Sequence, residues 1–377
     1  MENIFVFGKT VSGDAFTDRE EETNRLIYNF RYGINTFIVS PRRWGKTSLV
    51  MRAKSLVDSA EVRVVYVDIQ QCRTKEDFCI RYASAVIQQT SSRVEEWLDN
   101  AKNFLSRFRF SVNASADPAT EYSFRMDISP KEQSLEDILQ LSEHIAKKKK
   151  CRVVVCIDEF QQIGTFADSD VFQSLLRTVW QHHQYSCYCL FGSKKHMMEA
   201  FFNDVSRPFY KFGDIIYLQR IPTAYWVKYI QQKFSDEGKK ITKPQASRIV
   251  EVVDGNSSYI QQLSWYVFIN SKQNVTKSVI DMSVEQLIDQ CAEVFEAKTE
   301  NLTNYQMQLL IAIADGVGTG LSSADVIEKY RLGSSANVSA LKKLLLERDY
   351  IMSEDKRVVL SDPVMGLWIR RVYCAVK

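Results

Sequence analysis

The sequence predicts an α/β fold for residues 1–220, in which helices cover both faces of a parallel sheet, followed by two smaller and mainly helical parts. The first observation behind this prediction is that short apolar segments alternate with longer amphipathic ones, as in sheets whose strands are joined by helices. The predicted strands are Thr36–Ser40, Arg63–Asp68, Arg152–Asp158, Cys187–Gly192 and Asp214–Gln219. The predicted helices are Arg19–Arg31, Lys46–Ala60, Thr74–Phe108 and Val171–His182.

The second observation is that the pattern becomes helical beyond residue 220. Four segments predict an α-helical lid over residues 221–300: Ala224–Phe234, Lys243–Val252, Ser258–Ser271 and Val284–Thr299. Residues 301–377 predict three helices and a strand pair, at Asn304–Ala314, Ser323–Tyr330, Ser335–Glu347, Ile351–Ser353 and Val358–Leu360. This order is that of a winged helix, whose third helix can enter a DNA major groove.

One segment interrupts the alternation of the first part. Residues 108–112 and 122–128 alternate apolar and polar side chains around a turn that contains Asp117-Pro118, which predicts an inserted β-hairpin. The polar face of this hairpin carries Arg107, Arg109 and Arg125. That face is either an ordinary solvated surface or a contact surface for a partner or a neighbouring subunit.

The composition is that of an ordinary globular protein. A chain of 377 residues is long enough for two or three domains, and 45% apolar and 25% charged residues are typical values. The net charge of +3 does not favour a polyanionic partner for the chain as a whole. The eight cysteines lack Cys-x-x-Cys spacing and are expected to be reduced core residues. Without a signal peptide or an 18-residue apolar stretch, we expect a cytoplasmic protein.

A tight turn directly after the first predicted strand has the pattern of a phosphate-binding loop. The segment SPRRWGKTS at residues 40–48 leads into the helix predicted to begin at about Lys46. Backbone N–H groups of such a turn point at nucleotide phosphates, and the helix N-terminus adds partial positive charge. Lys46 can reach the β- and γ-phosphates, and the Thr47 hydroxyl can ligate Mg²⁺. Ser40 replaces the usual first glycine and tolerates a positive φ less well, but Gly45, where the backbone must approach the phosphates, is present.

A second segment is expected to complete the site at the same edge of the sheet. The apolar run at residues 153–157 has the pattern of a central parallel strand and ends in Asp158 and Glu159. Ligands of open parallel sheets bind at the C-terminal ends of the strands. Asp158 is expected to hold Mg²⁺ through water or the Thr47 hydroxyl, and Glu159 to orient the attacking water. The alternative, a core strand with an Asp-Glu helix cap, is disfavoured by the phosphate loop.

The charges of the last part leave its partner open. Residues 302–377 contain ten Lys or Arg and eight Asp or Glu residues, whereas a DNA-binding domain is usually clearly basic. The candidates for DNA phosphate contacts are Lys342 and Lys343 on the third helix and Lys356 and Arg357 on the wing. We expect either duplex DNA binding through these residues or a protein-docking role.

Five stretches resemble the archaeal ATPase family of AAA-type P-loop ATPases, which is related to the signal-transducing STAND ATPases. They are Asp14–Glu22, Pro41–Leu49, Asp158–Gln161, Gly255–Gln261 and Ser361–Arg371. The resemblance covers nearly the whole chain. It implies an AAA+ core with a parallel sheet and an inserted β-hairpin, then an α-helical lid and a C-terminal winged helix. It also implies ATP and Mg²⁺ as cofactors.

The resemblance implies roles for further residues. Together with the loop residues above, it implies a nucleotide-binding set that comprises Phe16, Arg19, Pro41, Arg42, Arg43, Trp44, Gly45, Lys46, Thr47 and Ser48. Phe16 and Arg19 would lie at the adenine pocket. Ser193 would sense the γ-phosphate, and the alternative is an ordinary turn serine. Arg207 would act in trans on the γ-phosphate of a neighbouring subunit in a homo-oligomer, with Lys211 as the competing candidate.

The remaining loop side chains have two interpretations each. Arg42 and Arg43 either raise the affinity for a polyanion or hold the loop through ion pairs. Trp44 either packs in the core, which is the more common role of a tryptophan, or stacks on the nucleotide.

Two functions follow from these observations. One is an ATPase that assembles on DNA, as origin-recognition initiators with the same domain order do. The other is a nucleotide-dependent protein-interaction switch that uses the winged helix for docking. In both, ATP turnover is expected to be slow until a partner or a neighbouring subunit completes the site, because catalysis depends on positioning and electrostatics. A chain that only binds ATP is disfavoured by the presence of both Lys46 and Glu159.

Overall fold

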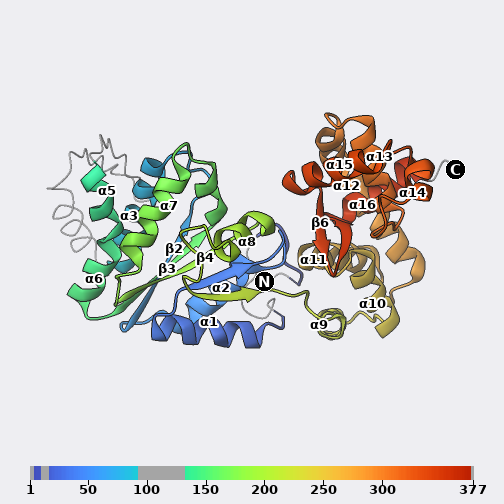
Figure 1. Cartoon of the computed structure of the whole chain (residues 1–377). Helices are drawn as coiled ribbons and strands as arrows, with labels where there is room; N and C mark the ends of the chain where they lie inside the picture. The colour runs from blue at the N-terminus through green and yellow to red at the C-terminus, as the bar shows by residue number, and fades with distance from the viewer. Residues whose placement is uncertain (1–3, 10–16, 92–131, 375–377) are drawn as a thin grey trace, which may run out of the picture. The chain divides into compact units, whose positions relative to one another are not determined.

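The computed structural model describes residues 4–9, 17–91 and 132–374, and the chain divides into two compact units (Figure 1). The first unit is Arg19–Gln219, and the second is Arg220–Lys377 together with Met1–Asp18. The predicted hairpin, with Arg107, Arg109 and Arg125, lies outside the described residues, and so does Phe16. One hydrophobic core continues through the second unit from Trp226 to Ile369, so its division at residue 300 stays a prediction.

A five-stranded parallel sheet with the order β2-β3-β4-β1-β5 forms the centre of the first unit. Its strands are β1 (Thr36–Val39), β2 (Val62–Asp68), β3 (Arg152–Asp158), β4 (Ser186–Gly192) and β5 (Asp214–Tyr217). All five predicted strands are present, and the predicted α/β fold is confirmed. Because the strands are parallel, the C-terminal ends of β1 and β3 lie at the same edge of the sheet.

Helices cover both faces of this sheet. In Figure 1, α3, α5, α6 and α7 lie together on one side, and α1 and α2 lie on the other. The helices of this unit are α1 (Glu20–Tyr32), α2 (Lys46–Val57), α3 (Lys75–Thr90), α5 (Glu132–Leu139), α6 (Leu141–Lys149), the 3₁₀ helix η2 (Phe160–Thr165), α7 (Ser169–Trp180) and α8 (Lys195–Asn203). The sequence did not predict α5, α6, η2 and α8, which are all shorter than ten residues and therefore show little periodicity.

The long predicted helix from Thr74 starts as expected but ends earlier. Thr74 accepts a hydrogen bond from the Asp77 backbone, and the Asp77 side chain accepts one from the Thr74 backbone, which is a capping box. The helix α3 ends at Thr90 and is followed by Ser91 in an extended conformation, so it does not continue to Phe108 as one helix.

The second unit contains the helical segments predicted for residues 221–300. They are followed by the predicted order of three helices and a β-hairpin. Its elements are α9 (Thr223–Asp236), α10 (Lys243–Val252), α11 (Ser257–Asn270), α12 (Lys277–Thr299), α13 (Asn304–Ala314), α14 (Ala324–Tyr330), α15 (Ser335–Glu347), β6 (Ile351–Glu354), β7 (Arg357–Leu360), α16 (Pro363–Ile369) and η3 (Arg370–Cys374). The strands β6 and β7 pair in an antiparallel wing. The winged helix is therefore confirmed. Thr276 caps α12, which begins two turns before the predicted start at Val284.

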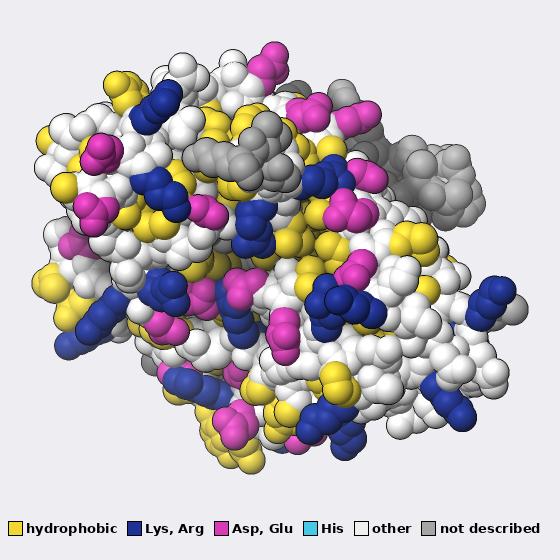
Figure 2. All heavy atoms as spheres, turned by 90° about the vertical axis from the view of Figure 1, so that its right-hand side faces the viewer, with side chains coloured by type: hydrophobic (Ala, Val, Ile, Leu, Met, Phe, Trp, Pro, Cys, Tyr) yellow, Lys and Arg dark blue, Asp and Glu magenta, His cyan; other side chains and the backbone are white. Residues whose placement is uncertain are grey.

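One face of the second unit carries charges of both signs. Figure 2, which faces this unit, shows Lys and Arg side chains intermingled with Asp and Glu side chains. Within the described ranges, no helix is both long enough and apolar enough to cross a membrane.

Candidate nucleotide-binding site

The loop after β1 has the backbone that the phosphate-loop pattern requires. Gly45 has a φ of 86° and is the N-cap of α2, and Arg43 has a φ of 67°. A Cβ on Gly45 would meet no other atom within 4 Å, so glycine suits this position because of its φ and not because of crowding. Ser40 is buried and is not among the residues with positive φ. The serine at the first position therefore causes no backbone strain.

Lys46 lies buried beneath this loop. Its ammonium group donates hydrogen bonds to the carbonyl oxygens of Ser40, at 3.0 Å, and Pro41, at 2.7 Å, and to Ser40 Oγ at 3.2 Å. Burial lowers the pKa of Lys46 to about 8, although the carboxylates of Asp158 and Glu159 oppose this shift. Lys46 is thus electrostatically linked to the end of β3.

Asp158 connects the loop helix to two strands of the sheet. Its Oδ2 atom accepts hydrogen bonds from Thr47 Oγ1 at 2.8 Å and from Tyr66 Oη at 2.9 Å. Its Oδ1 atom accepts one from the Glu159 backbone at 2.8 Å. Burial raises the pKa of Asp158, and the hydrogen bonds from Thr47 and Tyr66 oppose that rise. The Asp158 carboxylate is therefore held in one orientation.

A hydroxyl and a carboxylate in direct contact suit Mg²⁺. This ion takes oxygen ligands and usually binds through one or two protein groups together with substrate phosphates. Thr47 and Asp158 provide such a pair beside the phosphate loop. The residues present therefore fit the predicted cofactor.

Glu159 is held by two neighbours at the end of β3. Its Oε2 atom accepts hydrogen bonds from Ser193 Oγ, at 2.8 Å, and from Gln161 Nε2. Gln161 packs directly on Gly192, where an added Cβ would lie 1.7 Å from Gln161 Oε1. Glu159 itself has a φ of 56°, which is uncommon for a residue with a long side chain. Ser193 therefore contacts the expected water-orienting residue.

Of the two predicted adenine-side residues, Phe16 and Arg19, the structure describes Arg19. Arg19 is buried and donates from Nη2 to the Trp44 carbonyl oxygen at 3.4 Å, so it contacts the phosphate loop. It also forms an ion pair with Glu22 at 2.9 Å. Trp44 is buried, as expected for a core residue, whereas Arg42 and Arg43 are exposed. Ser48 is buried in the first turn of α2.

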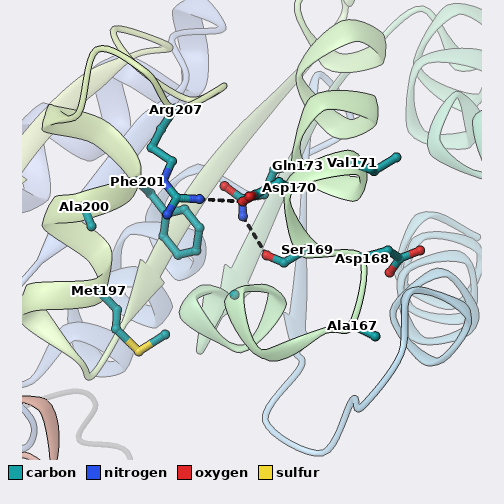
Figure 3. Close-up of a pocket in the computed structure, with 11 residues that line it drawn as sticks. Ala167, Asp168, Ser169, Asp170, Val171, Gln173, Met197, Ala200, Phe201 and Arg207 are labelled. Atoms are coloured by element: carbon teal, nitrogen blue, oxygen red, sulfur yellow. Dashed lines mark hydrogen bonds and ion pairs between the residues drawn. The ribbon is translucent and has the colours of Figure 1, made fainter.

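Arg207 lies beside a pocket of about 550 Å³ (Figure 3). It follows α8 and forms an ion pair with Asp170 near the start of α7, on the opposite side of this pocket. Its ion-pair partner is thus on α7 and not in the phosphate loop. The competing candidate Lys211 has a φ of 51° and lies 5.3 Å from the Tyr210 ring centroid.

Sequence reasoning missed Tyr66 and Gln161. Tyr66 reaches Asp158 because β2 pairs with β3 in a register that places Asp68 beside Asp158. A tyrosine in a strand is a weak signal unless the neighbouring strand is known. Gln161 lies two residues after Glu159 in the sequence, and this short separation is a signal for the contact between their side chains.

Comparisons with known proteins agree with this geometry. A parallel sheet with a phosphate loop and an acidic pair at one edge, followed by a winged helix, defines a P-loop ATPase fold. The family described as an ATPase domain predominantly from Archaea matches residues 16–263, and a probable winged helix domain matches residues 293–371. The chain belongs to this archaeal ATPase family, as its motifs predicted.

Solved structures show the same fold. The Walker-type ATPase PABY2304 of Pyrococcus abyssi is similar with a TM-score of 0.69 and 17% identity, over 98% of this chain and 100% of that one. The ORC2 protein of Aeropyrum pernix, in ADPNP and ADP complexes, is similar with a TM-score of 0.59 and 13% identity, over 99% and 98%. No curated protein matches significantly. These two neighbours share the fold of this chain.

Proposed function

We propose that this chain binds ATP with Mg²⁺, hydrolyses it, and uses the nucleotide state as a switch that acts on its winged helix. The observation that carries this proposal is the hydrogen bond between Thr47 and Asp158. It joins the start of the phosphate-loop helix to the end of β3, where a P-loop ATPase needs its magnesium ligands. The match of the ATPase family over residues 16–263 supports the same function.

The roles of the site residues follow from their contacts. Lys46 donates hydrogen bonds to the carbonyl oxygens of Ser40 and Pro41. When ATP binds, Lys46 would donate to the β- and γ-phosphates instead, so phosphate oxygens would replace these two carbonyl acceptors. When bound through Thr47 and Asp158, Mg²⁺ neutralises charge on the phosphates. Pro41, Arg42, Arg43, Gly45 and Ser48 would surround the phosphates, and Arg19 would hold the loop through Trp44.

Glu159 would orient the attacking water. Its carboxylate accepts hydrogen bonds from Ser193 and Gln161, which limits its rotation. Ser193 would donate its hydrogen bond to the γ-phosphate in place of Glu159. Binding of ATP would thus change the contacts of Glu159. A site of this kind acts by positioning and electrostatic stabilisation, so small displacements of Glu159 should have large effects on the rate.

Arg207 would complete the site of a neighbouring chain in a homo-oligomer. An arginine that approaches from a second subunit stabilises charge on the γ-phosphate in the transition state. The ion pair of Arg207 with Asp170 is largely exposed, and exposed pairs contribute little free energy. Arg207 could therefore exchange Asp170 for a phosphate at small cost.

The partner of the winged helix has two candidates. Duplex DNA is favoured by Lys342 and Lys356, which line one pocket between α15 and the wing. A protein partner is favoured by the intermingled charges on the face of this unit seen in Figure 2. DNA binding should depend steeply on salt, because phosphate contacts release counterions, and protein docking should depend on it much less.

The test is ATP turnover per chain as protein concentration rises, with and without duplex DNA. A steep rise with concentration would support completion of the site by a neighbour, and stimulation by DNA would support the DNA-assembling ATPase. Slow turnover that responds to neither would favour a monomeric switch with a protein partner. Complete lack of ATP binding would overturn the proposal.

A further inference from the structure

The winged helix contains a pocket of about 310 Å³ that the roles proposed above for ATP binding and hydrolysis do not use. It lies between the loop that joins α13 to α14, the helix α15 and the wing of β6 and β7. Its polar lining comes from Thr319 and Ser322 of the loop, Ser339 and Lys342 of α15, and Lys356 of the wing. Three separate elements thus contribute polar side chains to one small space.

The pocket is positively charged. Among the described residues that line it, Lys342 and Lys356 are the only charged ones. Within the part of the chain that the structure describes, neither lysine has an ion pair or a hydrogen bond with another side chain. Lys342 is half-buried, and Lys356 is exposed at the tip of the wing. Two ammonium groups at one pocket repel each other, and an anion between them would remove that repulsion.

The backbone around the pocket is fixed before any ligand binds. The Val358 N–H donates to the Gly318 carbonyl oxygen at 2.8 Å, which joins the loop to β7. A Cβ on Gly318 would lie 3.1 Å from the Val358 carbonyl oxygen, so glycine permits this close approach. Asp355 and Lys356 have φ values of 46° and 65°, which define a tight turn at the wing tip. The two lysines are thus mounted on connected elements.

The lining chemistry selects a phosphate group. Hydroxyls and ammonium groups are donors for phosphate oxygens, and the Thr319 and Ser322 hydroxyls are exposed beside the two lysines. The Ser339 hydroxyl already donates to the Ser335 carbonyl oxygen at 3.1 Å and is a weaker candidate. The lining, as far as the structure describes the chain, has no carboxylate that could hold a cation and no aromatic ring that could stack on a base. A single phosphate therefore fits better than a metal ion or a nucleobase.

We propose that this pocket binds one phosphate group and that a backbone phosphate of duplex DNA is its main source. Helix α15 is the helix that a winged helix presents to the major groove, and the wing lies beside it, so a phosphate bound by both would fix α15 against the duplex. This step rests on the proposed role of the winged helix in DNA binding, but not on ATP hydrolysis. A free phosphate would use the same donors.

The experiment uses the full chain and fluorescence anisotropy with a labelled 20-base-pair duplex at several salt concentrations. Lys342→Gln and Lys356→Gln are compared with Lys343→Gln and Arg357→Gln, which remove neighbouring charges outside the pocket lining. Each pocket variant should weaken duplex binding about tenfold, because it loses a charged hydrogen bond. Each should also reduce the slope of log affinity against log salt by about one. The two controls should have smaller effects. ³¹P NMR titration of the same variants with inorganic phosphate measures the affinity of the pocket for free phosphate.

The outcomes distinguish a DNA phosphate from a free phosphate, and they distinguish the pocket from the proposed ATPase function. Loss of duplex binding in the pocket variants beyond that in the controls supports the DNA source. Loss of inorganic phosphate binding alone, without a duplex effect, supports the pocket but assigns it to a free phosphate. Equal effects of all four variants on both ligands would overturn the pocket. Lys46→Ala is included because it should abolish ATP turnover, while its duplex binding, measured without nucleotide, should equal that of wild type. Failure of the ATPase and failure of the pocket can therefore be distinguished.

Discussion

Thr47 and Asp158 are 111 residues apart in the sequence, and a hydrogen bond of 2.8 Å joins their side chains. Tyr66 donates to the same Asp158 oxygen from the neighbouring strand. The carboxylate that would bind Mg²⁺ is therefore oriented from two sides. This orientation makes Tyr66 a positioning residue for the proposed metal site.

Removal of the Tyr66 hydroxyl should impair the use of magnesium. In Tyr66→Phe, Asp158 loses one donor, so we expect turnover to fall about tenfold at limiting Mg²⁺. The fall should be smaller at saturating Mg²⁺, and nucleotide binding without Mg²⁺ should not change. Turnover measured against Mg²⁺ concentration checks this, with the exposed Tyr32→Phe as control. An unchanged Mg²⁺ dependence would leave Tyr66 a purely structural residue.

Lys46 and Glu159 should have separable effects. Lys46→Ala removes the cation expected to bind the phosphates and should abolish ATP binding in a fluorescent-nucleotide titration. Glu159→Gln keeps the shape but lowers the ability to polarise water, so it should bind ATP and turn it over at least 100-fold more slowly, roughly the scale of lost acid–base assistance. Full turnover in Glu159→Gln would exclude Glu159 from the mechanism.

Arg207 should be needed for activation by neighbouring chains. In Arg207→Ala, the rise of turnover per chain with protein concentration should disappear. The free energy of unfolding should fall by no more than about 1 kcal/mol, because the ion pair with Asp170 is exposed. Lys211→Ala is the matched control, and loss of the concentration dependence in that variant alone would transfer the role to Lys211.

Arg220 should stabilise the wing. It forms an ion pair with Asp254, two residues after α10, and another, at 2.7 Å, with Glu354 at the end of β6. Arg220→Met leaves both half-exposed carboxylates without this partner, so we expect a loss of about 1–3 kcal/mol of unfolding free energy. Hydrogen exchange of β6 and β7 should become faster. Equal protection of the wing in wild type and variant would contradict this.

His183 should make the protein less stable in mild acid. Its Nδ1 atom lies 2.8 Å from Tyr188 Oη, and its Nε2 atom lies 3.0 Å from Gln140 Oε1. Burial lowers the pKa of His183 from 6.5 to about 4, so the unfolded chain binds more protons between these values. This contribution to stability is therefore complete above pH 6.5 and is lost as the pH falls from 6.5 to 4.

Urea denaturation at pH 7 and pH 5 measures this effect. His183→Gln should lose less stability between the two values than wild type does, whereas the exposed His182→Gln should behave as wild type. Equal losses in all three proteins would show that His183 does not contribute to the acid sensitivity.

The sequence alone predicted the sheet, the phosphate loop and the acidic pair because each is a local pattern. Lys46, Thr47, Asp158 and Glu159 lie in short motifs whose strand and helix context is visible in the sequence. The contact from Tyr66 was not visible, because it depends on β2 lying next to β3, which is a property of strand order.

The same limit applies to the winged helix. Charge alone selected Lys342, Lys343, Lys356 and Arg357 as equivalent candidates. The hydrogen bond between Val358 and Gly318 joins the α13–α14 loop to the wing, and the pocket beside it is lined by Lys342 and Lys356. The missed helix α16 depends on Asp362, whose side chain accepts hydrogen bonds from the Val364 and Met365 backbones, and on Pro363 in its first turn.

The backbone at Ser40 also changes how phosphate loops can be recognised. The left-handed conformation falls on Arg43 and Gly45, and the first loop position needs only a small side chain in an ordinary conformation. A search pattern that demands glycine at that first position would therefore miss loops of this kind, although their backbone geometry does not require glycine there. A pattern written as a sequence of permitted dihedral angles would accept them.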